Sequence, residues 1–199
     1  MGARADELLA FWFGPLDADG LAGEAAVARW FEGGPGFDEE LRRRFGALHA
    51  EARAGRLDGW AETPRGRLAL VLLLDQLSRD LHQVSAEAFA GDAQALALAR
   101  EALERGEDPA LALCERVFLL LPFEHAEDLA AQETSVAGFR ALAEQAPPRA
   151  RELFTIFVDH AARHRDVIAR FGRFPHRSAA LGRASTAAER AHLEKEGGF

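Results

Sequence analysis

Residues 63–74 read TPRGRLALVLLL and indicate most clearly how this chain folds. Thr63 followed by Pro64 is a typical helix start, because a threonine side chain caps free backbone N–H groups and proline suits the first helical turn. From Leu68 to Leu74 every residue is apolar, so a helix formed here has no polar side to face water. The segment therefore predicts a central helix that other helices enclose.

The same helical pattern continues on both sides of this segment. Apolar residues recur at spacings of three and four, and no window alternates apolar and polar residues as a half-buried strand does. Capping residues, prolines and glycines predict about nine helices, at approximately residues 6–13, 24–31, 38–55, 63–79, 85–105, 108–122, 124–144, 148–171 and from 186 onward. Because short connections favour antiparallel hairpins, we predict an all-α fold.

The length and composition are those of an ordinary globular domain. A chain of 199 residues, with 48% apolar and 28% charged residues, can bury a core without the help of a metal, cofactor or disulfide. We therefore expect one domain over residues 1–199 and no cofactor. The formal net charge of -8 argues against a nucleic-acid partner, since an acidic surface repels phosphate groups.

The sequence also favours a cytoplasmic protein. Its one cysteine, Cys114, cannot form an intramolecular disulfide, and it lies inside a predicted helix, where we expect it in the core. The first residues have no cleavable signal pattern, and the longest apolar run is too short to span a bilayer. We expect no membrane partner.

A basic segment, residues 160–183, stands out in this acidic chain. It holds six arginines and three histidines against one acidic residue, Asp166. Guanidinium groups bind carboxylates or phosphates at two points, and a phenylalanine ring stacks on flat ligands. From the loop of this segment we predict a ligand-binding set: Arg173, Phe174, His176 and Arg177. The alternative is that these arginines cap the preceding helix or pair with acidic helices.

A second polar group, Asp75, Gln76 and Arg79, follows the apolar helix. Polar groups that close a buried helix need partners, so we expect all three in the ligand site, with Asp75 as a counter-charge for an arginine of the basic loop. Asp75 and Arg79 are four residues apart, however, and a local ion pair between them is the simpler alternative.

A third polar group lies in residues 121–128, which read LPFEHAED. His125 is a candidate acid or base, and Asp128 is a candidate to orient it. The structural alternative places Glu124, Glu127 and Asp128 in the first turn of a helix, where acidic residues offset the helix dipole.

His160 and His164 lie four residues apart on the apolar stripe of the helix at 148–171. Such a pair supplies two ligands of a metal site but needs a third from elsewhere. Two buried imidazoles that hydrogen-bond to carboxylates or carbonyls are the favoured interpretation, since no glutamate follows the first histidine as in metalloprotease helices. We predict no metal site and retain His164 as a catalytic candidate.

Over nearly its whole length the chain resembles a mainly bacterial family catalogued as domain of unknown function 924. The resemblance rests on Phe11–Gly14, Trp30–Phe31, Asp75–Gln76 with Arg79, Leu121–Phe123 with His125, Glu127 and Asp128, and His164–Asp166 continuing through Phe171–Arg177. Ala126 and Ser178 depart from the family pattern. The resemblance implies a tetratricopeptide-like helical fold that gathers the polar motif residues, and it brings no established reaction.

Three hypotheses about function follow from these patterns. In the first, the polar residues form a pocket for a small anionic or planar ligand, with His125, Asp128 and His164 as acid–base groups. In the second, the chain is a tetratricopeptide-like module that binds a peptide partner. In the third, the arginines and histidines form a structural ion network. Replacing Arg173 by Ala abolishes ligand binding under the first hypothesis and lowers stability under the third.

Overall fold

The structure is a computed structural model that describes residues 2–83 and 85–199, apart from the side chain of Glu32. Within these ranges it contains ten α-helices: α1 (Ala3–Phe13), α2 (Glu24–Glu32), α3 (Pro35–Arg53), α4 (Pro64–Leu74), α5 (Gln76–His82), α6 (Asp92–Glu104), α7 (Leu113–Glu124), α8 (Leu129–Gln145), α9 (Arg151–Phe171) and α10 (Ala187–Glu196). The described residues contain no β-strand beyond an isolated bridge between Leu16 and Ala22. The prediction of an all-α fold is therefore confirmed.

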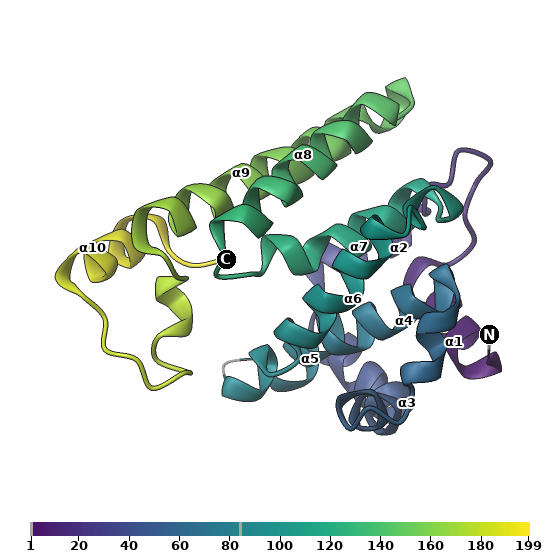
Figure 1. Cartoon of the computed structure of the whole chain (residues 1–199), viewed down its shortest axis with the longest axis horizontal. Helices are drawn as coiled ribbons and strands as arrows, with labels where there is room; N and C mark the ends of the chain where they lie inside the picture. The colour runs from purple at the N-terminus through teal and green to yellow at the C-terminus, as the bar shows by residue number, and fades with distance from the viewer. Residues whose placement is uncertain (1, 84) are drawn as a thin grey trace.

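Helix α4 lies at the centre, as its sequence predicts. All residues from Leu68 to Leu74 are at most 1% exposed, and α1, α3, α6 and α7 pack around them (Figure 1). Thr63 accepts the capping hydrogen bond from the backbone N–H of Gly66. Arg67 is also buried, where Glu101 and Glu107 accept its hydrogen bonds and compensate the loss of water.

Helices α8 and α9 lie side by side as a long antiparallel hairpin (Figure 1). One apolar cluster runs from α1 to α9, whereas a smaller cluster around Phe174 lies where α9 meets the loop that follows it. Gly172 ends α9 with a φ of 69°, a conformation that favours glycine. Thr186 and Glu189 form the predicted capping box of α10.

The tenth helix arises because the chain breaks at Asp75. The predicted helix at 63–79 is two helices, α4 and α5, and Asp75 lies between them. The predicted helix start at Ser85 is also wrong, since residues 86–89 form only a short 3-10 turn and α6 begins at Asp92. Gly91 explains this geometry: a Cβ atom there would lie 2.3 Å from the carbonyl oxygen of Leu74, so α6 starts in tight contact with the end of α4.

Three further helix boundaries, at both ends of α7 and at the start of α8, differ from the sequence prediction. The helix predicted from Asp108 begins at Leu113, after a 3-10 turn, and it continues through Pro122 to Glu124. Pro122 is buried, and packing in the core compensates the backbone hydrogen bond that proline removes. Asp128 is the N-cap of α8, and the capped helix begins at Leu129. Glu124 thus ends one helix and is not in the first turn of the next.

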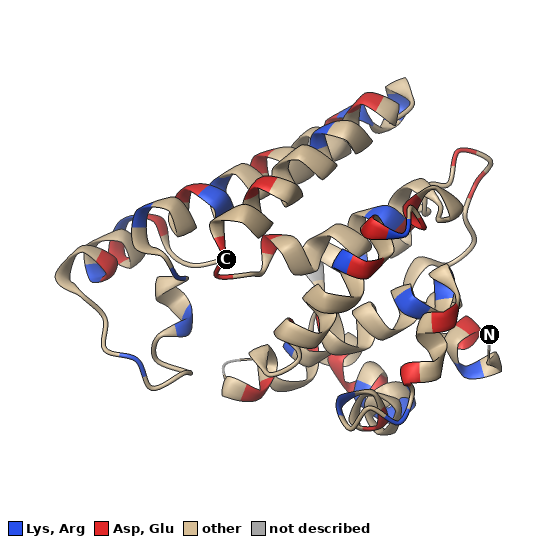
Figure 2. Ribbon diagram, viewed as in Figure 1, with Lys and Arg blue, Asp and Glu red and all other residues tan. Residues whose placement is uncertain are grey.

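Acidic and basic residues are interspersed along α9 and α10 (Figure 2). The basic segment at 160–183 is accordingly well neutralised. Its ion pairs are Arg165 with Glu133 and Asp166, Arg173 with Glu189, Arg177 with Asp92, and Arg183 with Glu127. Among the described residues, no helix has the length and apolar character needed to cross a membrane.

Candidate functional site

Five of the predicted site residues line one cavity of about 470 Å³. They come from segments that lie far apart in the sequence, namely Arg79 of α5, His125 after α7, His164 of α9, and His176 and Arg177 of the 3-10 turn Pro175–Arg177. The remaining lining residues are Gln83, Phe89, Ala179, Ala180 and Phe199. The fold therefore gathers half of the predicted site residues around one cavity.

Asp75 and His125 form a buried pair beside this cavity. The Asp75 carboxylate is fully buried, with Oδ1 2.7 Å from Nδ1 of His125 and Oδ2 accepting from Nε2 of Gln76 at 2.6 Å. Burial alone would raise the pKa of Asp75, but the charge of Arg79 and the hydrogen bond with His125 outweigh it and hold this pKa well below its usual range. An ionised carboxylate only accepts hydrogen bonds, so the His125 proton resides on Nδ1.

This arrangement leaves Nε2 of His125 as the proton acceptor of a neutral ring. Burial and the nearby charge of Arg79 lower the pKa of His125, against the opposing effect of Asp75. The imidazole is therefore neutral at pH 7. A carboxylate that orients a neutral imidazole in this way is the arrangement that general-base histidines require.

Two arginines share one carboxylate in the cavity wall. Arg79 donates from Nη1 and Nη2 to the two Asp92 oxygens at 3.0 and 3.2 Å, and Nη1 of Arg177 donates to Asp92 Oδ2 at 3.0 Å. Arg79 also lies 3.1 Å from Asp75 Oδ1, so the predicted local ion pair between residues 75 and 79 is present. Asp75 is not the counter-charge of a loop arginine; Asp92 fulfils that role.

Arg177 is only partly satisfied. Its side chain is 6% exposed, and its Nε atom is buried without a hydrogen-bond partner among the described residues. Its guanidinium carbon lies 4.4 Å from the ring centre of Phe174 and 4.7 Å from that of Phe89. Burial and repulsion from Arg79 lower the pKa of Arg177 to about 10. The cavity wall thus carries a buried positive charge with a free N–H donor.

The other two histidines of the cavity are neutral. Nδ1 of His164 donates to the carbonyl oxygen of His160 at 2.9 Å, so Nε2 is again the free acceptor. Burial and the neighbouring His125 lower the pKa of His164 to about 3. Burial together with Arg177 and Arg79 lowers the pKa of His176 to about 4. Neither ring competes with the arginines for an anion at pH 7.

Glu124 stands behind His164, with Oε1 3.3 Å from Nδ1 of that histidine. It is 4% exposed. Burial and the charge of Asp75 raise its pKa to about 8, against the opposing effect of Arg163. At neutral pH this carboxyl is mostly protonated, which adds no negative charge to repel an anion.

Three predicted site residues lie elsewhere. Arg173 forms an ion pair with Glu189 and donates to the carbonyl oxygen of Ala184, outside the cavity. Asp128 caps α8 by accepting from the backbone N–H of Ala131, and it does not orient His125. Phe174 is fully buried, so its face is not open to a ligand. The conformation of each is explained by local packing or capping.

His160 and His164 are joined by a hydrogen bond within α9. The side chain of His164 donates from Nδ1 to the backbone carbonyl oxygen of His160. Across residues 2–83 and 85–199, no group of three or more His, Cys, Asp or Glu side chains is placed to hold a metal ion. Cys114 is buried as predicted, and burial raises the pKa of its thiol to about 12.

Sequence comparison assigns the chain to a family. Residues 8–197 match the family described as "Bacterial protein of unknown function (DUF924)". The chain belongs to the DUF924 family. Its fold is similar to the structure of the protein of unknown function ATU0120 from Agrobacterium tumefaciens, with 37% sequence identity, a TM-score of 0.81, and coverage of 97% of this chain and 98% of that one. The curated proteins contain no significant match.

Several residues in or next to the cavity of this DUF924 protein escape prediction from sequence. The predicted helix at 85–105 places Asp92 in its interior. In the structure α6 begins at Asp92, and the Asp92 carboxylate lies between Arg79 and Arg177. Phe89 lies in an unforeseen 3-10 turn. Phe199 carries no pattern at all, yet its ring stacks on His164 with 3.6 Å between ring centres.

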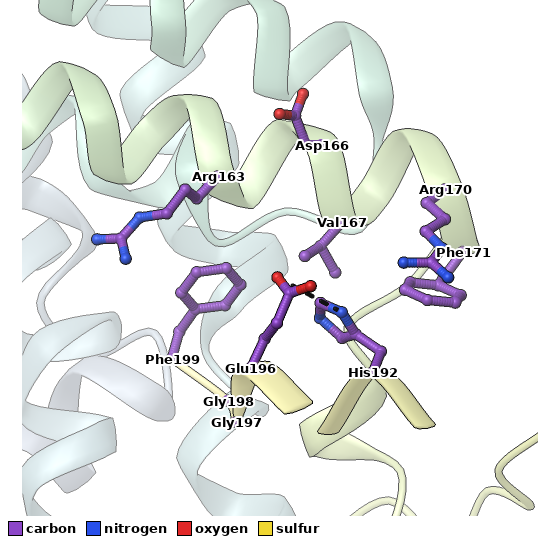
Figure 3. A pocket seen from close by; sticks show the side chains of 10 residues that line it. All are labelled: Arg163, Asp166, Val167, Arg170, Phe171, His192, Glu196, Gly197, Gly198 and Phe199. Atoms are coloured by element: carbon purple, nitrogen blue, oxygen red, sulfur yellow. Dashed lines mark ion pairs between the residues drawn. The ribbon is translucent and has the colours of Figure 1, made fainter. Parts of the chain in front are cut away.

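A second cavity of the DUF924 protein, also about 470 Å³, lies between α9 and α10 (Figure 3). It is lined by Arg163, Asp166, Val167, Arg170, Phe171, His192, Glu196, Gly197, Gly198 and Phe199. None of the predicted site residues belongs to it. Phe199 alone lines both cavities and so stands between them.

Proposed function

We propose that the cavity beside Asp75 and His125 binds a small anionic ligand through Arg177 and Arg79, and that His125 exchanges a proton with it. The observation that carries this proposal is the buried Nε atom of Arg177, which has no partner among the described residues. A buried donor left without an acceptor costs about 1–3 kcal/mol. A ligand oxygen removes that cost and forms a charge-assisted hydrogen bond.

The charges around the cavity favour the same ligand class. Arg79 and Arg177 share Asp92, and Asp75 lies next to Arg79, while the three histidines are neutral. Glu124, the remaining buried acid, is mostly protonated. Burial and repulsion from Arg79 lower the pKa of Arg177 to about 10, so a neighbouring anion would stabilise its charged form. The two arginines and the carboxylates of Asp75 and Asp92 balance in formal charge, and the attraction for an anion comes from the buried charge of Arg177 and from its Nε–H donor, which is unpaired among the described residues.

The Asp75–His125 pair supports a step beyond binding. Its hydrogen bond fixes the proton on Nδ1 and presents an unprotonated Nε2. A bound anion next to this ring favours the protonated imidazole, so the ring takes up a proton as the ligand binds. General acid–base chemistry on the ligand is the function that this geometry supports best.

Calorimetric titration with inorganic phosphate and with acetate at pH 7 tests the binding step. We expect Arg177→Gln to weaken binding at least tenfold, because it removes the charge and the Nε–H donor. Arg140→Gln, at an exposed position of α8, is the matched control and leaves binding unchanged. If neither anion binds the unaltered protein and Arg177→Gln lowers its unfolding free energy by about 3 kcal/mol or more, the arginines form a structural ion network instead.

Titration in buffers of different ionisation enthalpy tests the proton step. With acetate, which is fully ionised at pH 7 and brings no proton of its own, we expect proton uptake on binding by the unaltered protein and none by His125→Gln. Equal uptake by both proteins would exclude His125 as the group that exchanges the proton.

A further inference from the structure

We propose that the cavity contains a subsite for a planar ring, which the side chain of Phe199 occupies here, and that its ligand is a small aromatic acid. This inference rests on the proposed anion site at Arg177. It adds the shape of the ligand and names the residue that selects it.

The ring of Phe199 lies where a flat ligand would stack. Its plane is inclined by 22° to that of His164, and the two ring centres are 3.6 Å apart. Phe174 meets both rings edge-on, at 5.6 Å and 76° from His164 and at 6.1 Å and 83° from Phe199. His176 meets Phe199 at 6.0 Å and 78°. These three aromatic side chains define the slot: His164 stacks on one face of the Phe199 ring, and Phe174 and His176 lie nearly perpendicular to it, the geometry that aromatic groups prefer.

The segment that carries Phe199 is built to bring this ring close without other side-chain contacts. A Cβ atom on Gly198 would lie 2.8 Å from Cβ of His176, and Gly197 has a φ of 75°, so glycine is required at both positions. Phe199 as a whole residue is nevertheless 50% exposed. Its position therefore depends chiefly on the slot, and a ligand ring that stacks equally well can replace it.

The slot lies next to the anion site. The guanidinium of Arg177 is 4.4 Å from the centre of the Phe174 ring, whose edge faces His164 and Phe199. Arg177, His164 and Phe199 also line the same cavity. A ring in the slot can therefore present an attached carboxylate or phosphate to Arg177. Figure 3 shows Phe199 at the edge of the neighbouring cavity, so its departure opens the slot on that side.

Binding of matched acids tests this inference. The probes are benzoate and cyclohexanecarboxylate, which carry the same charge on a flat and a puckered ring, together with inorganic phosphate. The proteins are the unaltered chain, Phe199→Ala, and the control Phe31→Ala, whose phenylalanine is equally exposed at 50% but stacks on Phe157 outside the cavity. Proton NMR of the His164 imidazole reports stacking through the ring-current shift.

We expect the unaltered protein to prefer benzoate to cyclohexanecarboxylate at least fivefold. Phe199→Ala should bind benzoate at least tenfold more tightly, because the protein's own ring no longer competes, and Phe31→Ala should bind like the unaltered chain. The upfield His164 signal should move downfield in Phe199→Ala and return when benzoate binds.

Two results would overturn the inference, and they differ in what they say about the anion site. If phosphate binds in an Arg177-dependent manner but benzoate shows no preference, or binds more weakly to Phe199→Ala, the ring subsite is wrong and the anion site stands. If none of the three anions binds either protein, both proposals fail.

Discussion

Asp75 and His125 lie 50 positions apart in the sequence, yet Oδ1 of one is 2.7 Å from Nδ1 of the other. The carboxylate is fully buried, Nε2 of Gln76 donates to its Oδ2, and Arg79 forms an ion pair with its Oδ1. Such a pair holds one tautomer of the imidazole in one orientation. The Asp75–His125 pair therefore has the most tightly fixed geometry of the groups beside the cavity.

Asp75→Asn should therefore be costly. It removes one of the two charges that compensate half-buried Arg79 and leaves the buried partners of Asp75 unpaired, so we expect the unfolding free energy to fall by about 3–5 kcal/mol in urea denaturation. Asp166→Asn is the surface control, because the Asp166 side chain is 69% exposed and pairs with its neighbour Arg165 on α9, and it should change stability by less than about 1 kcal/mol. Similar losses of unfolding free energy in both variants would mean that buried Asp75 contributes no more to stability than a surface carboxylate.

His164 should make the protein sensitive to acid. Burial lowers its pKa in the folded state to about 3, below its ordinary value of 6.5, so the unfolded chain binds the extra proton between these values. The stabilisation is complete above pH 6.5 and is lost as the pH falls, by up to about 1.4 kcal/mol per pH unit. Urea denaturation from pH 7 to pH 4 should show a shallower decline in His164→Gln. If the unfolding free energy of His164→Gln falls with pH as steeply as that of the unaltered protein, His164 does not have a lowered pKa in the folded state.

Glu124 should have the opposite effect. Its pKa in the folded state is raised to about 8 from 4.5, so the folded protein binds the extra proton between these values and stability falls as the pH rises through them. Glu124→Gln resembles the protonated carboxyl. We expect it to match the unaltered protein at pH 5 and to exceed it in unfolding free energy at pH 8, by about 1 kcal/mol or more. If Glu124→Gln is no more stable than the unaltered protein at pH 8, folding does not raise the pKa of Glu124.

Gly91→Ala should disturb the start of α6. Its Cβ atom would lie 2.3 Å from the carbonyl oxygen of Leu74, an overlap that only backbone movement relieves, and we expect a loss of about 2 kcal/mol or more. Gly36→Ala is the control, because nothing lies within 4 Å of a Cβ atom there and the residue is in α3. This control should be neutral or stabilising. Anion binding should weaken only in Gly91→Ala, since Asp92 follows Gly91.

Arg173→Ala should leave anion binding intact, contrary to the expectation from sequence. Arg173 holds α10 through Glu189 and the carbonyl oxygen of Ala184. We expect hydrogen exchange to speed up in α10 while the phosphate affinity stays that of the unaltered chain. Loss of phosphate binding without faster hydrogen exchange in α10 would mean that Arg173 belongs to the anion site.

The sequence by itself determined the helices, because the signals that form a helix are local. Thr63 and Pro64 start α4, Gly172 ends α9, and the apolar run at 68–74 requires a buried position, all within one or two helical turns. The motif residues also indicated the DUF924 family, and five of them, Arg79, His125, His164, His176 and Arg177, line one cavity in the structure.

Only the tertiary structure decided which groups meet. Arg173 and Arg177 are equivalent in sequence, yet one faces Glu189 and the other faces Asp92, 85 positions away. The close approach of Gly91 to Leu74 sets the position of Asp92, and the glycines before Phe199 allow its ring to reach His164. Hydrogen bonds within a helix join residues four apart, whereas these contacts depend on how distant helices pack, which no local pattern encodes.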